Sequence, residues 1–345
     1  MASAGSDPAA PVWETGLWQD TERVPDSLAA TLQGRDGFAE VAALLARPGT
    51  RRVIVSGSGA SYYVALAMWL ASLQAADPLA EVVPVPAGLL ARNAFKWQPG
   101  DVLLAVSSSG EARDLIEATE SELLPRPFAA ITANPEGSVP RSAGARAVTA
   151  VIQQAAITHT QAFCAAVAAS LGILAIATHD RKLDRALGNL PGDCQQSITR
   201  TRRWAPSALA ALTTPPAAAV FGTGPAWAGA LEGALLLKEV ARIPAEGSET
   251  REAATTVMTG LLPRHLAVSL ATADDPLAEE AELVCRSIPC QLLRVPGGDV
   301  ADRRLAAVGT FAPLVAIAIH LALRAGWDAD DPDWYSRYER TARRS

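Results

Sequence analysis

The pattern of apolar and polar positions divides the chain into short β-branched runs that alternate with longer segments of helical spacing. Strands are predicted at 52–56, 81–85, 102–106, 128–132 and 147–152, and again at 217–221, 266–270 and 291–295. Helices are predicted over 62–73, 111–120, 160–178, 227–242 and 305–323. Strands and helices that alternate in this way are typical of a parallel, doubly wound sheet with its ligand site beyond the carboxyl ends of the strands.

The second half of the chain repeats the order of elements of the first. GSGAS (57–61) follows the first predicted strand, and GTGPA (222–226) follows the corresponding strand of the second half. We therefore predict an α/β protein with two domains, each a doubly wound parallel sheet flanked by helices. The predicted division is an N-terminal tail with a lead-in helix (1–34), a first domain (35–180), a second domain (195–325) and a C-terminal tail (326–345). The charged segment 179–193 is predicted to link the two domains.

The polar turn after the strand 102–106 is the strongest candidate for a binding site. Three hydroxyls, Ser107, Ser108 and Ser109, and then Gly110 stand between this strand and the next predicted helix. The first-turn N–H groups of a helix lack intrahelical acceptors and lie at the positive end of its dipole, so this junction suits an anion such as phosphate. Alternatively, one serine caps the helix and the others are solvated. A cap needs only one hydroxyl, which favours the anion site.

The corresponding turn of the second half has the opposite character. After the strand 266–270 the chain reads ATADDPLAEEAE, which places Asp274 and Asp275 where the first half has serines. Two carboxylates would repel a phosphate. Only the first half is therefore expected to hold an anion.

Composition and charge narrow the class of protein. Hydrophobic residues make up 49% and charged residues 19% of the chain, and the net charge of −6 comes without a basic block, which argues against nucleic acid as a partner. The four cysteines, Cys164, Cys194, Cys285 and Cys290, show no CxxC spacing, so we expect no metal site and no disulfide framework. The N-terminus lacks the pattern of a signal peptide, and the apolar segments 160–178 and 305–323 contain interruptions. We expect a cytoplasmic protein in which these segments are core helices and not membrane spans.

Four segments together resemble one known family, the tandem sugar isomerase (SIS) proteins. They are GSGASYYVA (57–65), SSSGEARD (107–114), THTQAF (158–163) and FGTGPAWAGALEGALLLKEVARIPAEG (221–247). The last is the most specific, and the chain is most similar to the isomerase half of glucosamine-6-phosphate synthase. The resemblance runs from about Trp18 to the C-terminus and implies a sugar phosphate or amino-sugar phosphate as ligand, no cofactor, and a homodimer.

The resemblance also implies roles for individual residues. The matched phosphate-binding residues are Ser61, Ser107, Ser108, Ser109 and Gly110, and Gly59 stands in the same glycine-rich turn. Glu239 matches the base that moves a proton between C1 and C2 of the open-chain sugar, although a glutamate beside Lys238 and Arg242 is often only surface charge. Further substrate contacts are implied for His159, Glu246, Glu252 and Arg337. The acids Glu246, Glu249 and Glu252 are equally compatible with an ordinary solvated loop, and His159 with a position beside a helix cap.

Several matched positions depart from the family pattern. Ala112 stands where the synthase has a threonine, while Leu236, Thr255 and Arg337 replace a lysine, a histidine and a lysine. We expect no glutaminase domain with its terminal cysteine ahead of the resemblance, and a separate glutaminase subunit is an open partner without support in the sequence. The expected function is therefore isomerisation, or a deaminase or deglycase type reaction, on a hexose or amino-hexose phosphate, with Glu239 as proton shuttle. The alternative is a catalytically silent, regulatory phosphosugar-binding protein.

Overall fold

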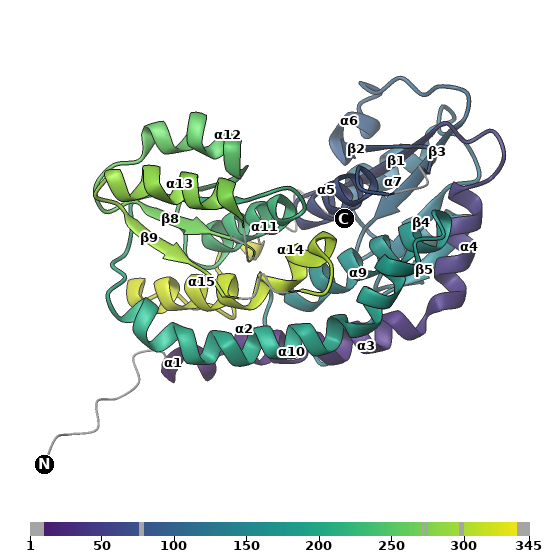
Figure 1. The fold of residues 1–345 in the computed structure, drawn as a ribbon. Helices are drawn as coiled ribbons and strands as arrows, with labels where there is room; N and C mark the ends of the chain where they lie inside the picture. The colour runs from purple at the N-terminus through teal and green to yellow at the C-terminus, as the bar shows by residue number, and fades with distance from the viewer. Residues whose placement is uncertain (1–9, 76–78, 271, 273–274, 297–299, 337–345) are drawn as a thin grey trace, which may run out of the picture. The chain divides into compact units, whose positions relative to one another are not determined.

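A computed structural model describes residues 10–75, 79–270, 272, 275–296 and 300–336 of the chain (Figure 1). The chain forms two compact units, each built around one parallel sheet. The first-sheet unit comprises Asp26–Ile152 and Gln161–Pro191, together with the segment from Asp333 onward. The second-sheet unit comprises the residues up to Pro25, Gln153–Thr160 and Gly192–Pro332. Each unit is described by itself.

The first sheet has five parallel strands in the order β2-β1-β3-β4-β5. Their bounds are β1 Arg52–Gly57, β2 Glu81–Pro86, β3 Asp101–Val106, β4 Ala129–Thr132 and β5 Ala145–Val148. Every residue of β3 is buried, as expected for a central strand that is covered on both faces. The fifth strand begins and ends earlier than the predicted 147–152, because β5 pairs with β4 over Ala145–Val148 only.

Helices cover both faces of the first sheet. They are α3 Val24–Gln33, α4 Arg35–Leu45, α5 Ala60–Ser72, α6 Ala87–Ala91, α7 Arg113–Glu120, α8 Ser138–Ser142 and α9 Thr160–Ala177. On one face α6, α7 and α8 share an apolar core with the strands, which includes Leu103, Leu115 and Phe128. Elsewhere in the unit α9 lies so close to α4 that a Cβ added at Gly172 would approach the ring of Phe38 to 3.0 Å. The doubly wound architecture predicted for the first half is confirmed.

The second sheet has four parallel strands in the order β7-β6-β8-β9. Their bounds are β6 Ala218–Gly222, β7 Ala245–Glu249, β8 Leu266–Ser269 and β9 Gln291–Arg294. The strand β7 is absent from the sequence prediction. It lies at the edge of the sheet and pairs with β6 from Ala218 with Ala245 to Gly222 with Glu249. The acids near the end of this segment therefore belong to a strand and the helix after it, and not to a loop.

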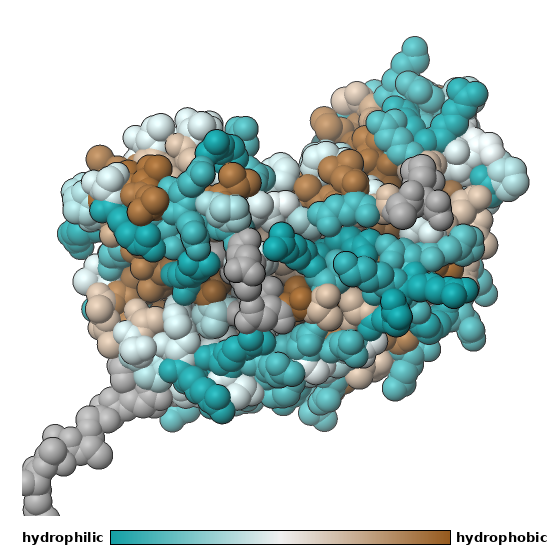
Figure 2. Space-filling model, viewed as in Figure 1, coloured by the Kyte–Doolittle hydropathy of each residue, from teal (hydrophilic) through white to brown (hydrophobic). Residues whose placement is uncertain are grey.

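The helices of the second-sheet unit are α1 Ala10–Trp13, α2 Gly16–Glu22, α11 Ala226–Glu239, α12 Thr250–Thr255, η1 Val257–Gly260, α13 Pro276–Ser287, η2 Arg303–Leu305, α14 Ala306–Gly309 and α15 Phe311–Ala325. An apolar core that includes Phe221, Met258 and Cys285 joins the sheet to α12, η1 and α13. The helix α11 packs on β6 and β7 and also on α14 and α15. Apolar surface is visible over α12 and α13 (Figure 2), where Leu283 is 61% exposed.

Two segments are long and apolar enough to cross a membrane by length and composition. They are Thr160–Ala177, of which 89% is buried, and Arg303–Ala325, of which 100% is buried. Burial of this extent is what core helices of a folded domain show.

The segment 179–193, predicted as a link, is largely helical, and the division between the two units falls within it, between Pro191 and Gly192. Helix α10 runs from Arg181 to Ala210 without a break, although Pro191 and Gly192 lie inside it. Leu183, Leu187 and Leu190 are buried and recur at helical spacing, which explains why the helix persists. Hydrophilic side chains dominate the visible surface along α10 (Figure 2).

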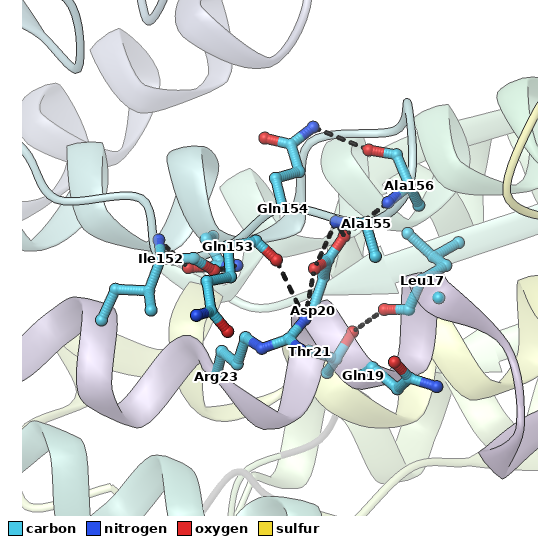
Figure 3. Close-up of polar contacts among 12 residues, drawn as sticks. Leu17, Gln19, Asp20, Thr21, Arg23, Ile152, Gln153, Gln154, Ala155 and Ala156 are labelled. Atoms are coloured by element: carbon cyan, nitrogen blue, oxygen red, sulfur yellow. Dashed lines mark hydrogen bonds and ion pairs between the residues drawn. The ribbon is translucent and has the colours of Figure 1, made fainter.

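In the second-sheet unit a buried carboxylate fixes the segment that leads to α9. Asp20 of α2 is fully buried and accepts N–H bonds from Ala155 (2.9 Å) and Ala156 (2.8 Å), while Arg23 donates to Asp20 and to the carbonyl of Gln153 (Figure 3). The carboxylate of Asp330 in turn accepts N–H bonds from the first two residues of α2, each at 2.8 Å. Residues 153–157 are thus anchored to α2.

Candidate functional site

The two polar turns of the first half lie at one edge of the first sheet. The strands β1 and β3 are parallel neighbours, with Ser56 in register with Ala105. Ser61 stands in the first turn of α5, directly beyond β1, and Ser107 directly beyond β3. Carboxyl ends of adjacent parallel strands are the usual ligand edge of such a sheet. Ser61 and Ser107–Gly110 thus both lie at this edge of the first sheet.

The serine hydroxyls support the turn and do not cap the helix. The side-chain oxygen of Ser107 accepts the N–H of Gly110 at 3.1 Å, and that of Ser109 accepts the N–H of Glu111 at 3.2 Å. The helix α7 begins later than predicted, at Arg113, with Ala112 at its N-cap and no side-chain cap in the described chain. The alternative that one serine merely caps the helix is therefore wrong. A hydroxyl whose oxygen accepts an N–H keeps its own O–H for donation to a ligand.

Glycines shape both turns. Gly59, the N-cap of α5, has φ of +56°, and Gly110 has φ of +69°, a backbone region that other residues enter only with strain. Space is also restricted at Gly110, since an added Cβ would lie 3.0 Å from the Cα of Gly137. These two positions explain why glycine is needed at the turns. The turn at Gly59 leads into α5, and the turn at Gly110 is followed by α7. The N-terminus of each helix is the positive end of its dipole.

Glu239 is the last residue of α11 in the second-sheet unit. Its side chain is largely buried, and this desolvation raises its pKa from the ordinary 4.5 to about 7, while the charge of Lys238 acts in the opposite direction. A carboxyl group with a pKa near neutrality can both accept and release a proton under physiological conditions. Its surroundings therefore differ from those of a plain surface glutamate.

A second carboxylate lies two helical turns earlier on the same face of α11. Glu232 is 2% exposed, and its Oε2 atom has no hydrogen-bond partner in the described part of the chain. Burial raises its pKa well above the usual value, and the nearby Glu239 carboxylate raises it further. Both effects favour the uncharged form of the Glu232 carboxyl group. The sequence analysis did not select Glu232, although it is the only acid inside the apolar run LEGALLL.

The replaced family positions fall in different surroundings. Leu236 is fully buried on α11, so an apolar side chain fills this place in the core. Thr255 is exposed on α12 and donates to carbonyl groups of its own helix. Arg337 lies outside the described residues. No group of three His, Cys, Asp or Glu side chains in the described parts of the chain is arranged to hold a metal ion, and all four cysteines are free.

The remaining candidates lie in the second-sheet unit. Glu246 is exposed on the edge strand β7, and Glu252 is exposed in the first turn of α12. The carboxylate of Glu249 caps α12, since it accepts the N–H groups of Arg251 and Glu252. His159 is exposed just before α9 and follows the anchored segment 153–157. The structure thus assembles the predicted phosphate residues in one unit and places Glu239, Glu246, Glu252 and His159 in the other.

The second half keeps the glycine turn but uses its acids differently. Gly224 has φ of +55°, close to the value for Gly59, and Thr223 donates to Thr250 at 2.9 Å at the same edge of the second sheet. Asp275 caps α13 by accepting the N–H of Ala278. Asp274 lies outside the described residues. A capping carboxylate takes the position at which a phosphate would meet the helix.

Comparison with known proteins relates the first sheet and its polar turns to a domain family. The SIS domain model matches residues 49–179, which include both polar turns of the first sheet. Residues 49–179 form a SIS domain. The second sheet has the same parallel architecture, so that the fold corresponds to two SIS domains.

Relatives with established names extend the similarity beyond the first SIS domain. The glutamine–fructose-6-phosphate aminotransferase (isomerizing) of Thermosynechococcus vestitus is 27% identical over 311 residues, which cover 76% of this chain and 49% of the relative. The chain thus spans about half the length of that relative. The similar region is the isomerase part, which confirms the resemblance stated from the sequence.

Solved structures show the same fold at lower identity. The C-terminal domain of glucosamine-fructose-6-phosphate aminotransferase from Francisella tularensis has a TM-score of 0.77 at 18% identity and covers 94% of this chain and 99% of its own. Tagatose-6-phosphate ketose/aldose isomerase from Escherichia coli has a TM-score of 0.77 at 16% identity, with coverage of 93% and 96%. Both structures share the fold of this chain over nearly its whole length.

Proposed function

We propose that this protein binds a hexose phosphate or amino-hexose phosphate, with the phosphate on Ser61 and Ser107–Gly110. The observation that carries the proposal is the arrangement of two hydroxyl-bearing turns and two helix N-termini at the carboxyl ends of the neighbouring strands β1 and β3. Hydroxyl groups and helix N-termini there offer donors and positive dipole ends to one anion. The relatives named above act on sugar phosphates according to their names, which supports this choice of ligand.

The proposed reaction is proton transfer between C1 and C2 of the open-chain sugar, with Glu239 as the base. The shuttle must accept a proton from one carbon and return it to the other, so its pKa should lie near the working pH. A pKa of about 7 satisfies this requirement. Aldose–ketose isomerisation needs no further reactant, and the same proton transfer is a step in deamination or deglycation of an amino-sugar phosphate.

Binding without catalysis is the second candidate, and a specific observation supports it. Leu236 is fully buried in place of the family lysine, and Thr255 offers only a hydroxyl where the family has a histidine. General acid–base groups typically contribute about 10²–10⁴ in rate each, so their loss would leave a slow enzyme or a regulatory binding protein.

A substitution that changes charge tests the binding site. Ser109→Asp places a carboxylate in the proposed anion site and should abolish binding of inorganic phosphate and of hexose 6-phosphates through like-charge repulsion. Ser142→Asp is the matched control, since Ser142 is exposed at the end of α8. Isothermal titration calorimetry should show loss of binding for the first variant only. Equal affinity in wild type and Ser109→Asp would remove the proposed site.

Incubation with sugar phosphates in heavy water separates the enzyme from the binder. An isomerase should exchange the proton at C2 of its substrate with solvent, and Glu239→Gln should lose this exchange while it keeps much of the affinity. A protein that only binds should show no exchange in wild type for any hexose or amino-hexose phosphate tested, and that result would favour the second candidate.

A further inference from the structure

Glu111, the acid next to the SSSG turn, is directed toward a neighbouring turn. Its carboxylate accepts the N–H of Ser138 at 2.7 Å and is within 2.8 Å of the Ser138 hydroxyl, which donates to it. Ser138 begins α8, so the carboxylate also faces the positive end of a short helix. A carboxylate that points at an anion site would oppose binding of the anion. The Glu111 carboxylate is instead held by two hydrogen bonds from Ser138, a residue 27 positions later in the sequence.

The same neighbouring turn, residues 133–139, binds the carbonyl groups of the SSSG turn. The N–H of Ala133 donates to the carbonyl of Ser108 at 3.1 Å, and the side-chain amide of Asn134 donates to the carbonyl of Ser109 at 3.0 Å. The N–H of Val139 donates to the carbonyl of Gly110 at 3.0 Å. Three successive carbonyl oxygens thus face residues 133–139.

Backbone contact between the two turns is close. A Cβ on Gly137 would lie 2.7 Å from the Cα of Gly110, and a Cβ on Gly110 would lie 3.1 Å from the carbonyl oxygen of Asn134. Only a pair of glycines allows this approach. The two turns therefore form one packed unit in which the position of either limits the other.

We propose that Glu111 and Asn134 are positioning residues that orient the phosphate-binding turn. They act through residues 133–139: Asn134 holds the Ser109 carbonyl, and Glu111 ties the start of α7 to the start of α8. With its carbonyl oxygens held on that side, the turn can present hydroxyl groups and first-turn N–H groups to an anion without reorganisation, which is the condition for strong electrostatic binding. This inference rests on the proposed phosphate site.

Substitution at position 111 tests the inference through affinity. Glu111→Ala should weaken binding of inorganic phosphate about ten-fold, and Glu111→Gln should restore most of it, because its amide can accept from the Ser138 N–H and donate to the hydroxyl. Asn134→Ala should weaken binding in the same direction. The matched control is Glu117→Ala, at which a partly exposed glutamate of α7 pairs with Arg113, and it should stay within two-fold of wild type. Unchanged phosphate affinity in Glu111→Ala would overturn the inference, while loss of binding in Ser109→Asp would still support the site itself.

Hydrogen exchange tests the positioning role without any ligand. Glu111→Ala should accelerate amide exchange of residues 107–112 and 133–139, and the Ser138→Ala variant should do so in part. When Glu111→Ala and Ser138→Ala are combined, phosphate affinity should fall no further than in Glu111→Ala alone, because both substitutions break the same contact. Additive effects of the two substitutions, or exchange rates equal to those of wild type, would contradict the inference even if the protein proved to bind no phosphate.

Discussion

The carboxylate of Asp20 accepts the N–H of Ala155 at 2.9 Å, and this contact joins helix α2 to a segment that is 135 residues later in the chain. A second N–H, from Ala156, reaches the same carboxylate, which is fully buried. Because both donors would be left without acceptors, we expect Asp20→Ala to lower the free energy of unfolding by about 3 kcal/mol. Urea denaturation measures this change.

Glu40, exposed on α4, provides the control for this prediction. Glu40→Ala should change the free energy of unfolding by no more than about 0.5 kcal/mol. If Asp20→Ala were as mild as Glu40→Ala, the anchoring of residues 153–157 by Asp20 would be refuted. Hydrogen exchange of these residues should rise in Asp20→Ala and not in the control.

Gly110→Ala is expected to disturb the phosphate-binding turn for two reasons. Its φ of +69° is unfavourable for alanine, and the new Cβ would meet Gly137 and Asn134. Gly49→Ala is the matched control, because Gly49 has φ of +89° but nothing lies within 4 Å of an added Cβ. Both variants should lose about 1 kcal/mol of stability from the backbone, and Gly110→Ala should lose more and also bind phosphate poorly. Equal losses in the two variants would show that the contact with Gly137 is unimportant.

The fold could be predicted from the sequence where the periodicity was strong. The missed strand β7 reads AEGSE and has neither β-branched residues nor alternation, so its conformation comes from pairing with β6. Gly247 within it lies against α11, since a Cβ there would be 2.6 Å from the carbonyl oxygen of Ala230. The helical start of α10 was missed because the charged character of 179–193 favoured a link, whereas the buried Leu183, Leu187 and Leu190 form an apolar helix face.

The candidate site was predictable only in part. Three consecutive hydroxyls after a buried strand indicated a candidate anion turn, and the structure places Ser61 at the same edge of the first sheet. The partner of Glu111 is 27 residues away, so no local pattern could identify the contact with Ser138. Glu232 was missed because a single glutamate in a helical segment usually faces solvent, whereas this one is enclosed by the packing of α11.

The pKa of Glu239 predicts a dependence of stability on pH. Between the ordinary value of 4.5 and the folded value of about 7, the folded state binds more protons at this group than the unfolded state does. The free energy of unfolding should therefore fall as pH rises through this window, by about 3 kcal/mol from this group, and its contribution should be constant above it. Glu239→Gln should lack this component in urea titrations at a series of pH values. A difference between wild type and Glu239→Gln that stays constant from pH 4.5 to pH 7 would contradict the assigned pKa.

The same pKa predicts the pH dependence of catalysis if the protein is an isomerase. A base must be deprotonated to accept the proton, so kcat/KM should rise with pH through about 7 and then level off. Exchange of the C2 proton into heavy water, followed by mass spectrometry, measures this profile. A rate that falls as pH rises through 7 would exclude Glu239 as the base.

Restoration of the family lysine at position 236 is expected to damage the protein. Leu236 is fully buried on α11, and an ammonium group there would lose its hydration without a designed partner. Leu236→Lys should cost about 3 kcal/mol or more of stability, whereas Leu235→Lys, at a partly exposed neighbouring position, should cost clearly less. Thermal and urea denaturation of the two variants measure the difference. If Leu236→Lys were instead as stable as wild type and gained isomerase activity, position 236 would face the substrate, and its placement in the core would be wrong.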